Sequence, residues 1–314
     1  MRRFFSTCGA LPLLYIILPP GSLEAGSILN YPAGVRQAAM GGAAAALSGD
    51  SGSAAFNPAT AAGIPGTRVS LMYDSSYLDT SVYYASVFTP VLGGVIGAGI
   101  LWYDGGTLRI NAPDDPGMHG KRVRAQSDYL GTLTASGRIT GRIDAGVSIK
   151  YYSSTLIEEY SADTLTADAG LIWHTPLFSF GAETIPGRPY SPGVALGGSV
   201  RNIAGELKYD RVSEEIEILS GGGICYAVRV TPEDEGVFTA DLVYTERNGA
   251  VPYFGAEYAH RGMLFLRAGY RTSEGLDGFS LGFGLTYENF ALDYALMPDS
   301  TISRRHLFLI GVGL

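Results

Sequence analysis

Cysteine, tryptophan, charge and long hydrophobic runs are all scarce in this chain of 314 residues. It has 2 cysteines and 2 tryptophans, and charged residues make up 17%, below the roughly 25% usual in soluble domains. The strongest apolar run, residues 11–18, is far shorter than the roughly 20 residues of a membrane-spanning helix. The sequence therefore argues against a helical membrane protein.

Basic residues are also too few for a nucleic-acid-binding protein. The 22 Lys and Arg are outnumbered by 30 Asp and Glu, whereas nucleic-acid-binding proteins usually present a basic face. Glycine (43) and tyrosine (20) are abundant, and 46% of the residues are hydrophobic. This hydrophobicity argues against disorder, and each interior glycine would cost a helix about 1 kcal/mol relative to alanine. The composition favours β-structure.

Residues 1–25 have the features of a cleaved signal peptide. Two arginines precede an apolar stretch, and Ala25 provides the small residue before the cleavage point. Cleavage would also remove Cys8 and leave Cys225 alone, so no internal disulfide is expected. An exported chain without later spanning helices is either soluble or a β-barrel.

The rest of the chain alternates polar and apolar residues with a period of two, which is typical of strands with different faces. The clearest segments are 142–152, 164–173, 264–271 and 279–288. Turn signals divide the chain into about fourteen segments, an even number, as expected of a bacterial barrel. They begin near Thr67, Thr80, Leu92, Val123, Arg142, Thr164, Gly193, Leu219, Val237, Pro252, Met263, Phe279, Ala291 and Arg305.

A soluble β-sandwich would show the same alternation, with its polar face toward water. Two features favour a membrane barrel instead. The polar face is rich in Gly, Ser and Thr with single charges near mid-strand, and Tyr and Trp lie at strand ends, as in interfacial girdles. The predicted fold is an all-β, transmembrane antiparallel barrel of about 14 strands over residues 66–314, in the outer membrane of a Gram-negative bacterium.

Connection lengths predict which side of the membrane each loop faces, because periplasmic turns are short and extracellular loops are long. The long connections at 104–122, 153–163, 204–218 and 298–304 are predicted to be extracellular. One long connection, 175–192, breaks this rule because by the strand count it falls on the periplasmic side. Either the count slips there, or an inserted loop faces the periplasm.

The strand faces predicted to line the lumen carry charges of both signs. A selective pore would favour one sign, so we expect these side chains to pair with each other and with the N-terminal segment. The alternative is that some of them line a path for a solute. The predicted lumen charges are Arg142, Asp144, Lys150, Asp168, Arg201, Arg229, Asp241, Glu257, Arg267, Arg271, Glu288 and Asp293.

Residues 26–65 form a separate N-terminal segment that is too small and too apolar to stand alone in water. The lumen of the barrel would provide the cavity that buries it, so we expect a plug. The glycines at 41 and 42 are not followed by Gly-Lys-Ser/Thr, so they predict tight packing rather than a phosphate loop.

This segment carries a motif that resembles the N-terminus of the FadL/PorV-like outer-membrane barrels. The C-terminal stretches 292–298 and 305–308 resemble the ends of PorV/PorQ-like members. The motif residues are Gly34, Arg36, Met40, Gly41, Gly42, Asp50, Asn57 and Pro58. The chain is shorter than typical members, and its last residue is Leu314, where an aromatic residue is usual.

The resemblance implies roughly fourteen strands around an N-terminal plug. Arg36 would anchor the plug to a lumen carboxylate, and Asn57 with Pro58 would set the turn into the first strand. FadL-type members admit hydrophobic small molecules, whereas PorV-like members serve as carriers or scaffolds in type IX protein secretion. The implied partners are therefore outer-membrane lipid, the barrel assembly machinery, and either a hydrophobic small molecule or secretion-system proteins.

An enzyme is the least favoured class. No Ser/His/carboxylate set is recognisable, and the four histidines are scattered without metal-binding spacing. No catalytic residue, metal site or cofactor is expected.

Overall fold

Short helices precede the strands in this computed structural model, which describes residues 27–75, 80–110, 119–175, 193–209, 212–272, 278–298 and 304–314. The described helices are η1 (Ser27–Asn30), α1 (Val35–Ala39), η2 (Gly52–Ala55) and η3 (Pro58–Gly63). None of them is long and apolar enough to cross a membrane. The predicted signal peptide and residues 176–192 of the predicted periplasmic connection lie outside the described residues.

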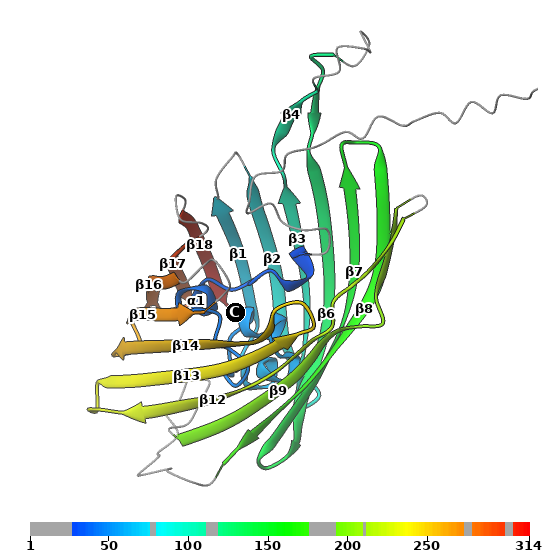
Figure 1. Ribbon diagram of the computed structural model, residues 1–314. Helices are drawn as coiled ribbons and strands as arrows, with labels where there is room; N and C mark the ends of the chain where they lie inside the picture. Colours follow the sequence, from blue (N-terminus) through cyan, green and yellow to red (C-terminus); the bar gives the residue numbers. More distant parts are fainter. Residues whose placement is uncertain are drawn as a thin grey trace, which may run out of the picture.

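Fourteen of the described strands form one closed antiparallel barrel (Figure 1), in which β1 pairs with β18 to complete the circle. In chain order the strands are β1 (Arg68–Ser75), β2 (Ser81–Val91), β3 (Gly94–Asp104), β6 (Gln126–Thr140), β7 (Ile143–Leu156), β8 (Tyr160–His174), β9 (Gly193–Ile203), β12 (Leu219–Arg229), β13 (Asp234–Thr245), β14 (Gly249–His260), β15 (Leu264–Arg271), β16 (Gly278–Tyr287), β17 (Phe290–Pro298) and β18 (Arg304–Gly313). The predicted barrel is confirmed, and closure excludes a sandwich of two separate sheets.

Two of the predicted loops contain strands of their own. β4 (Thr107–Arg109) pairs with β5 (Arg122–Arg124), and β10 (Glu206–Tyr209) pairs with β11 (Val212–Glu215). The strand predicted to begin near Val123 therefore begins at Gln126, because Val123 belongs to β5. The prediction of a long connection at 153–163 is wrong, because β7 and β8 remain paired as far as Leu156 and Tyr160.

The period-two alternation gives the strands an apolar outer face and an inner face that carries the buried charges. In β7, Asp144 and Lys150 are buried, whereas Val147 and Ile149 are exposed. Large apolar side chains are exposed in the same way on strands all round the barrel. Such a continuous apolar band is found on membrane barrels, where it faces lipid.

Aromatic residues gather on the outer face of four neighbouring strands. Tyr73, Tyr83, Trp102 and Tyr129 form a row with ring centroids 5.2, 5.0 and 6.2 Å apart. The row lies on the half of the barrel away from the rim that holds the start of β1 and the end of β18. The turns at that rim include two-residue turns, which are typical of the periplasmic rim, so we infer that the aromatic row marks the outer interface.

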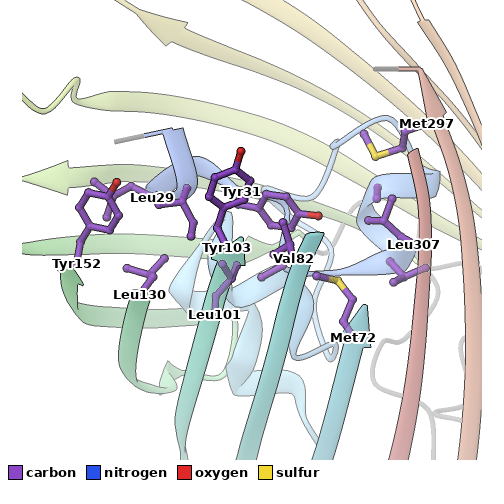
Figure 2. Close-up of a cluster of buried hydrophobic side chains, with 14 of the residues drawn as sticks. Leu29, Tyr31, Met72, Val82, Leu101, Tyr103, Leu130, Tyr152, Met297 and Leu307 are labelled. Atoms are coloured by element: carbon purple, nitrogen blue, oxygen red, sulfur yellow. The ribbon is translucent and has the colours of Figure 1, made fainter. Parts of the chain in front are cut away.

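The described N-terminal segment, residues 27–65, lies inside the barrel. α1 contacts β15, β16, β17 and β18, whereas η3 contacts β3, β6, β7 and β8 on the other side. Figure 2 shows Leu29 and Tyr31 of this segment among inward-pointing side chains of the strands, including Leu101 and Leu130. The main apolar core of the molecule therefore lies between the segment and the barrel wall.

Candidate functional site

Arg36 of α1 forms a two-pronged ion pair with Glu257 of β14. Its Nε and Nη2 atoms donate to the carboxylate oxygens at 2.8 and 2.7 Å. Arg267 of β15 donates to the same carboxylate at 2.6 Å, and its Nη1 donates to Asp293 of β17. The Glu257 side chain is 0% exposed, so both guanidinium groups are needed to compensate its burial. The motif arginine is thus joined to three strands of the barrel.

Met40, Gly41 and Gly42 follow α1 and pack closely against the barrel wall. Met40 and Gly41 lie against the backbone of β14 and β15, and Gly42 lies beside the ring of Tyr253. Gly41 has a φ of 71°, and a Cβ atom there would lie 2.7 Å from the backbone nitrogen of Tyr270. A Cβ atom on Gly269 of β15 would in turn overlap the backbone of Gly41. Glycine is therefore required on both sides of this contact, in agreement with tight packing.

The next part of the segment is held by β13 and β9. Asp241 accepts hydrogen bonds from the backbone N–H groups of Ala44 and Ala45 at 2.6 and 2.7 Å. The guanidinium group of Arg201 lies 5.8 Å from the centre of the Phe56 ring, within cation–π range. Two of the predicted lumen charges thus contact the segment directly.

Gly34 and Asp50 stabilise the segment internally. The side chain of Gln37 donates to Asp50 at 2.8 Å and to Ser53 at 2.6 Å, while the N–H of Gly52 donates to Asp50 at 2.8 Å. A Cβ atom on Gly34 would overlap the Gln37 amide. These motif residues therefore tie the start of the segment to its middle.

Asn57 joins three parts of the molecule. Its Nδ2 donates to the carbonyl oxygens of Ala45 at 2.6 Å and of Leu171 in β8 at 3.1 Å. Its Oδ1 accepts from the N–H of Ala59 at 3.0 Å and so caps η3, in which Pro58 is the first residue. The prediction that Asn57 and Pro58 set the turn into the first strand is wrong, because they begin η3 and β1 starts only at Arg68. The bonds of Asn57 to the rest of the segment and to the barrel wall were not predicted.

Tyr31 closes a cluster that sequence analysis did not single out. Its hydroxyl donates to Asp74 of β1, which also accepts from Arg305 of β18, and the Arg305 guanidinium lies 4.9 Å from the centre of the tyrosine ring. Burial raises the pKa of Tyr31 well above its usual range, so the hydroxyl remains a donor at neutral pH. The alternation in residues 68–75, which puts Asp74 on the inner face, was the available signal.

A second polar cluster contacts η1. Lys150 of β7 lies 2.8 Å from Asp168 of β8 and donates to the side chain of Asn202 at 2.6 Å. Asn202, with a φ of 60°, donates in turn to the side chain of Asn30 at 2.8 Å. The predicted charges Lys150 and Asp168 therefore form an ion pair that reaches the segment through an amide.

Asp144 pairs at the periplasmic end of the lumen. It accepts from Arg138 at 2.8 Å and from a ring nitrogen of His174 at 2.7 Å. Arg138 and His174 were not among the predicted lumen charges. They lie on the strands on either side of β7, and alternation within each strand does not identify such cross-strand pairs.

The assignment of Arg142 and Glu288 to the lumen is wrong. Both are exposed in short turns next to strand ends, and Glu288 has a φ of 51°. The alternation that places inner residues within a strand does not extend into a turn. Arg229 and Arg271, at the ends of β12 and β15, are half-buried.

A cavity of about 30 Å³ lies between the N-terminal segment and the wall formed by β2, β3 and β6. Its lining is mostly apolar, with the Lys150–Asp168 pair also at its wall. The volume is of the order of a single water molecule. Its lining includes Leu29, Tyr31, Tyr84, Phe88, Leu101 and Leu130.

Together these features define a closed outer-membrane β-barrel whose lumen is occupied by its own N-terminal segment. No protein-family model and no curated protein matches the chain. Solved structures match it in fold. The toluene transporter TodX of Pseudomonas putida has 12% identity and a TM-score of 0.56, and the match covers 88% of this chain and 96% of that chain.

Two further channels have a similar fold. The CymD monoaromatic hydrocarbon channel has 13% identity and a TM-score of 0.52, covering 89% of this chain and 96% of its own. A FadL homologue from Pseudomonas aeruginosa has 9% identity and a TM-score of 0.51, covering 88% and 97%. The predicted resemblance to FadL-type barrels is therefore confirmed for the fold.

Proposed function

We propose that this chain is an outer-membrane channel for hydrophobic small molecules, with residues 26–65 as a plug in its lumen. The observation that carries the proposal is the apolar cavity between the segment and the barrel wall. The segment forms one side of the cavity, so movement of the segment would enlarge the cavity. Most of the cavity lining is apolar. The fold shared with TodX and CymD, a toluene transporter and a monoaromatic hydrocarbon channel, supports this substrate class.

Passage requires the segment to shift. A cavity of about 30 Å³ is far smaller than the roughly 150 Å³ cavity that holds benzene in an engineered protein core. Leu29 and Tyr31 belong to the part of the segment that lines the cavity. Displacing them would open an apolar path, and each Å² of apolar solute surface removed from water contributes about 25 cal/mol.

Single-channel conductance in planar bilayers tests the plug. The intact barrel is expected to remain closed, and a variant lacking residues 26–64 is expected to conduct ions. If both forms stay closed, side chains of the barrel itself fill the lumen and the plug proposal fails.

Uptake of labelled toluene tests the substrate class separately. Outer-membrane vesicles that contain the intact chain should take up toluene faster than vesicles without it. If the barrel is plugged but does not accelerate toluene uptake, the plug proposal stands and the proposed substrate class is overturned.

A role as carrier or scaffold in type IX secretion is the alternative. Hairpins β4–β5 and β10–β11, which lie in the predicted contact loops 104–122 and 204–218, would then hold the partner. Pull-down with secretion-system proteins, together with unchanged toluene uptake, would favour this alternative.

A further inference from the structure

Three arginines project from one face of hairpin β4–β5. Residues directly opposite each other in an antiparallel pair share a face, as do residues two positions apart in one strand. Thr107 lies opposite Arg124, and Arg109 lies opposite Arg122. All three arginines are exposed, so the hairpin presents a cationic face on a chain with a net charge of -8.

This arrangement lowers the stability of the isolated hairpin, because like charges directly opposite each other repel. Arg124 lies 3.4 Å from Asp104, but no described carboxylate forms an ion pair with Arg109 or Arg122. The other hairpin has the opposite sign, with Glu206 opposite Glu215. Positive charge is therefore a property of β4–β5 and not of the extracellular loops in general.

The cationic face points toward the surrounding membrane. The Arg124 guanidinium lies 6.0 Å from the centre of the Trp102 ring, and Trp102 belongs to the aromatic row on the outer face of the barrel. Because Arg109 and Arg122 share the face of Arg124, they continue this outer face beyond the row. They do not share the inner face on which the lumen residues lie.

Backbone hydrogen bonds make the hairpin an extension of β3 and β6, and Figure 1 shows β4 rising beyond the barrel. Gly105 donates to Gln126 at 2.8 Å, and Ala125 donates to Gly106 at 2.9 Å. The ladder then continues through β4 and β5. The arginines thus lie on strands that continue outward from the aromatic row, on the side where the lipid headgroups of the outer leaflet lie.

We propose that Arg109, Arg122 and Arg124 bind the phosphate groups of an anionic lipid in the outer leaflet. Guanidinium groups match phosphate oxygens in a two-pronged geometry. The acyl chains of the same lipid would lie against the apolar outer face below the hairpin, where Ile100 and Leu133 are 55% and 65% exposed. Phosphate would also relieve the repulsion between Arg109 and Arg122.

Binding of fluorescent diphosphorylated lipid A to the folded full-length chain in zwitterionic detergent tests this proposal. The R109Q/R122Q double variant is expected to weaken binding about tenfold or more, and raised salt should weaken wild-type binding in the same direction. R109K/R122K keeps the positive charge but loses the planar guanidinium groups. Its affinity for lipid A should therefore lie between those of the wild type and R109Q/R122Q.

R261Q is the matched control, because it removes one exposed arginine from the opposite rim and should leave lipid binding unchanged. Equal binding by wild type and R109Q/R122Q would overturn the proposal, as would an equal loss in R261Q. Full displacement of the lipid by inorganic phosphate at the same concentration would indicate a simple anion site and would also overturn it. Heat-modified mobility of each variant in gel electrophoresis shows that the barrel is folded.

Discussion

At the scale of single residues, Glu257 is the carboxylate on which Arg36 and Arg267 converge. Replacing it with glutamine removes the negative charge that two buried guanidinium groups share, although Arg267 keeps its pair with Asp293. We expect Glu257→Gln to lower the free energy of unfolding by about 3–5 kcal/mol. Urea unfolding in lipid vesicles, followed by tryptophan fluorescence, measures this loss.

Glu233→Gln provides the control for that experiment. Glu233 pairs with Arg261 at 2.9 Å, but the two side chains are 52% and 59% exposed, so this substitution should cost less than about 1 kcal/mol. Similar losses in the two variants would show that the buried network does not hold the segment in the way the geometry indicates.

Substitutions at Asn57 can separate the stability that its hydrogen-bond donors contribute from the stability that it contributes as a helix cap. Asn57→Asp keeps the acceptor for Ala59, but it turns an oxygen toward the carbonyl groups of Ala45 and Leu171. We expect a loss of about 1–3 kcal/mol, at least as large as that of Asn57→Ala, in the same unfolding experiment. Asp caps helices as well as Asn does, so an unchanged stability would mean that only the cap matters.

At the scale of elements, alternation together with turn signals predicted most of the barrel strands. Segments such as 264–271 and 279–288 carry one polar and one apolar face, and pairing in a closed barrel is the arrangement that buries the first and exposes the second. The prediction failed where this pattern stops. Arg142 and Glu288 lie in turns, and hairpin strands of three or four residues are too short to show a period.

The contacts of the N-terminal segment could be predicted only in part. Motif glycines indicated close packing, and Arg36 indicated a carboxylate partner, but neither identifies which of the inner carboxylates lies opposite. That choice depends on the depth at which α1 sits in the lumen. The Tyr31–Asp74–Arg305 cluster shows the same limit, because its members come from opposite ends of the chain and meet only after the barrel closes.

Gly269 tests how closely the residues that follow α1 must approach β15. An added methyl group would overlap the backbone of Gly41, so Gly269→Ala should push the segment away from the wall, at a cost of about 1–3 kcal/mol. Transient openings in planar-bilayer recordings should become more frequent than in the wild type. Gly141→Ala is the matched control, because a Cβ atom there meets nothing within 4 Å. Equal recordings for both variants would contradict the close contact.

At the scale of the whole molecule, the segment is held from several sides at once. Arg36 connects it to β14, Asp241 holds it to β13, and Asn57 holds it to β8. Breaking one of these contacts leaves the others in place, so single substitutions should loosen the segment without releasing it. A solute that acts as proposed must instead shift the part that lines the cavity, near Leu29 and Tyr31.

Cys225 reports on such a shift without any substitution. It is a buried free cysteine in a cluster with Met40, Ala44 and Leu47 of the segment. We expect slow reaction with a water-soluble maleimide in the intact barrel and fast reaction in the variant lacking residues 26–64. Because the segment covers this thiol, toluene should accelerate the reaction of the intact barrel if entry of the solute displaces the segment as a unit.

The result separates two ways of opening. Accelerated labelling would mean that the segment moves as one body and carries Met40 away from β12 together with Leu29. Unchanged labelling, combined with toluene uptake, would mean that only the first residues of the segment move while the Arg36 network stays closed. The Cys225→Ser variant measures background reaction, and slow labelling of the deletion variant would contradict the placement of Cys225 beneath the segment.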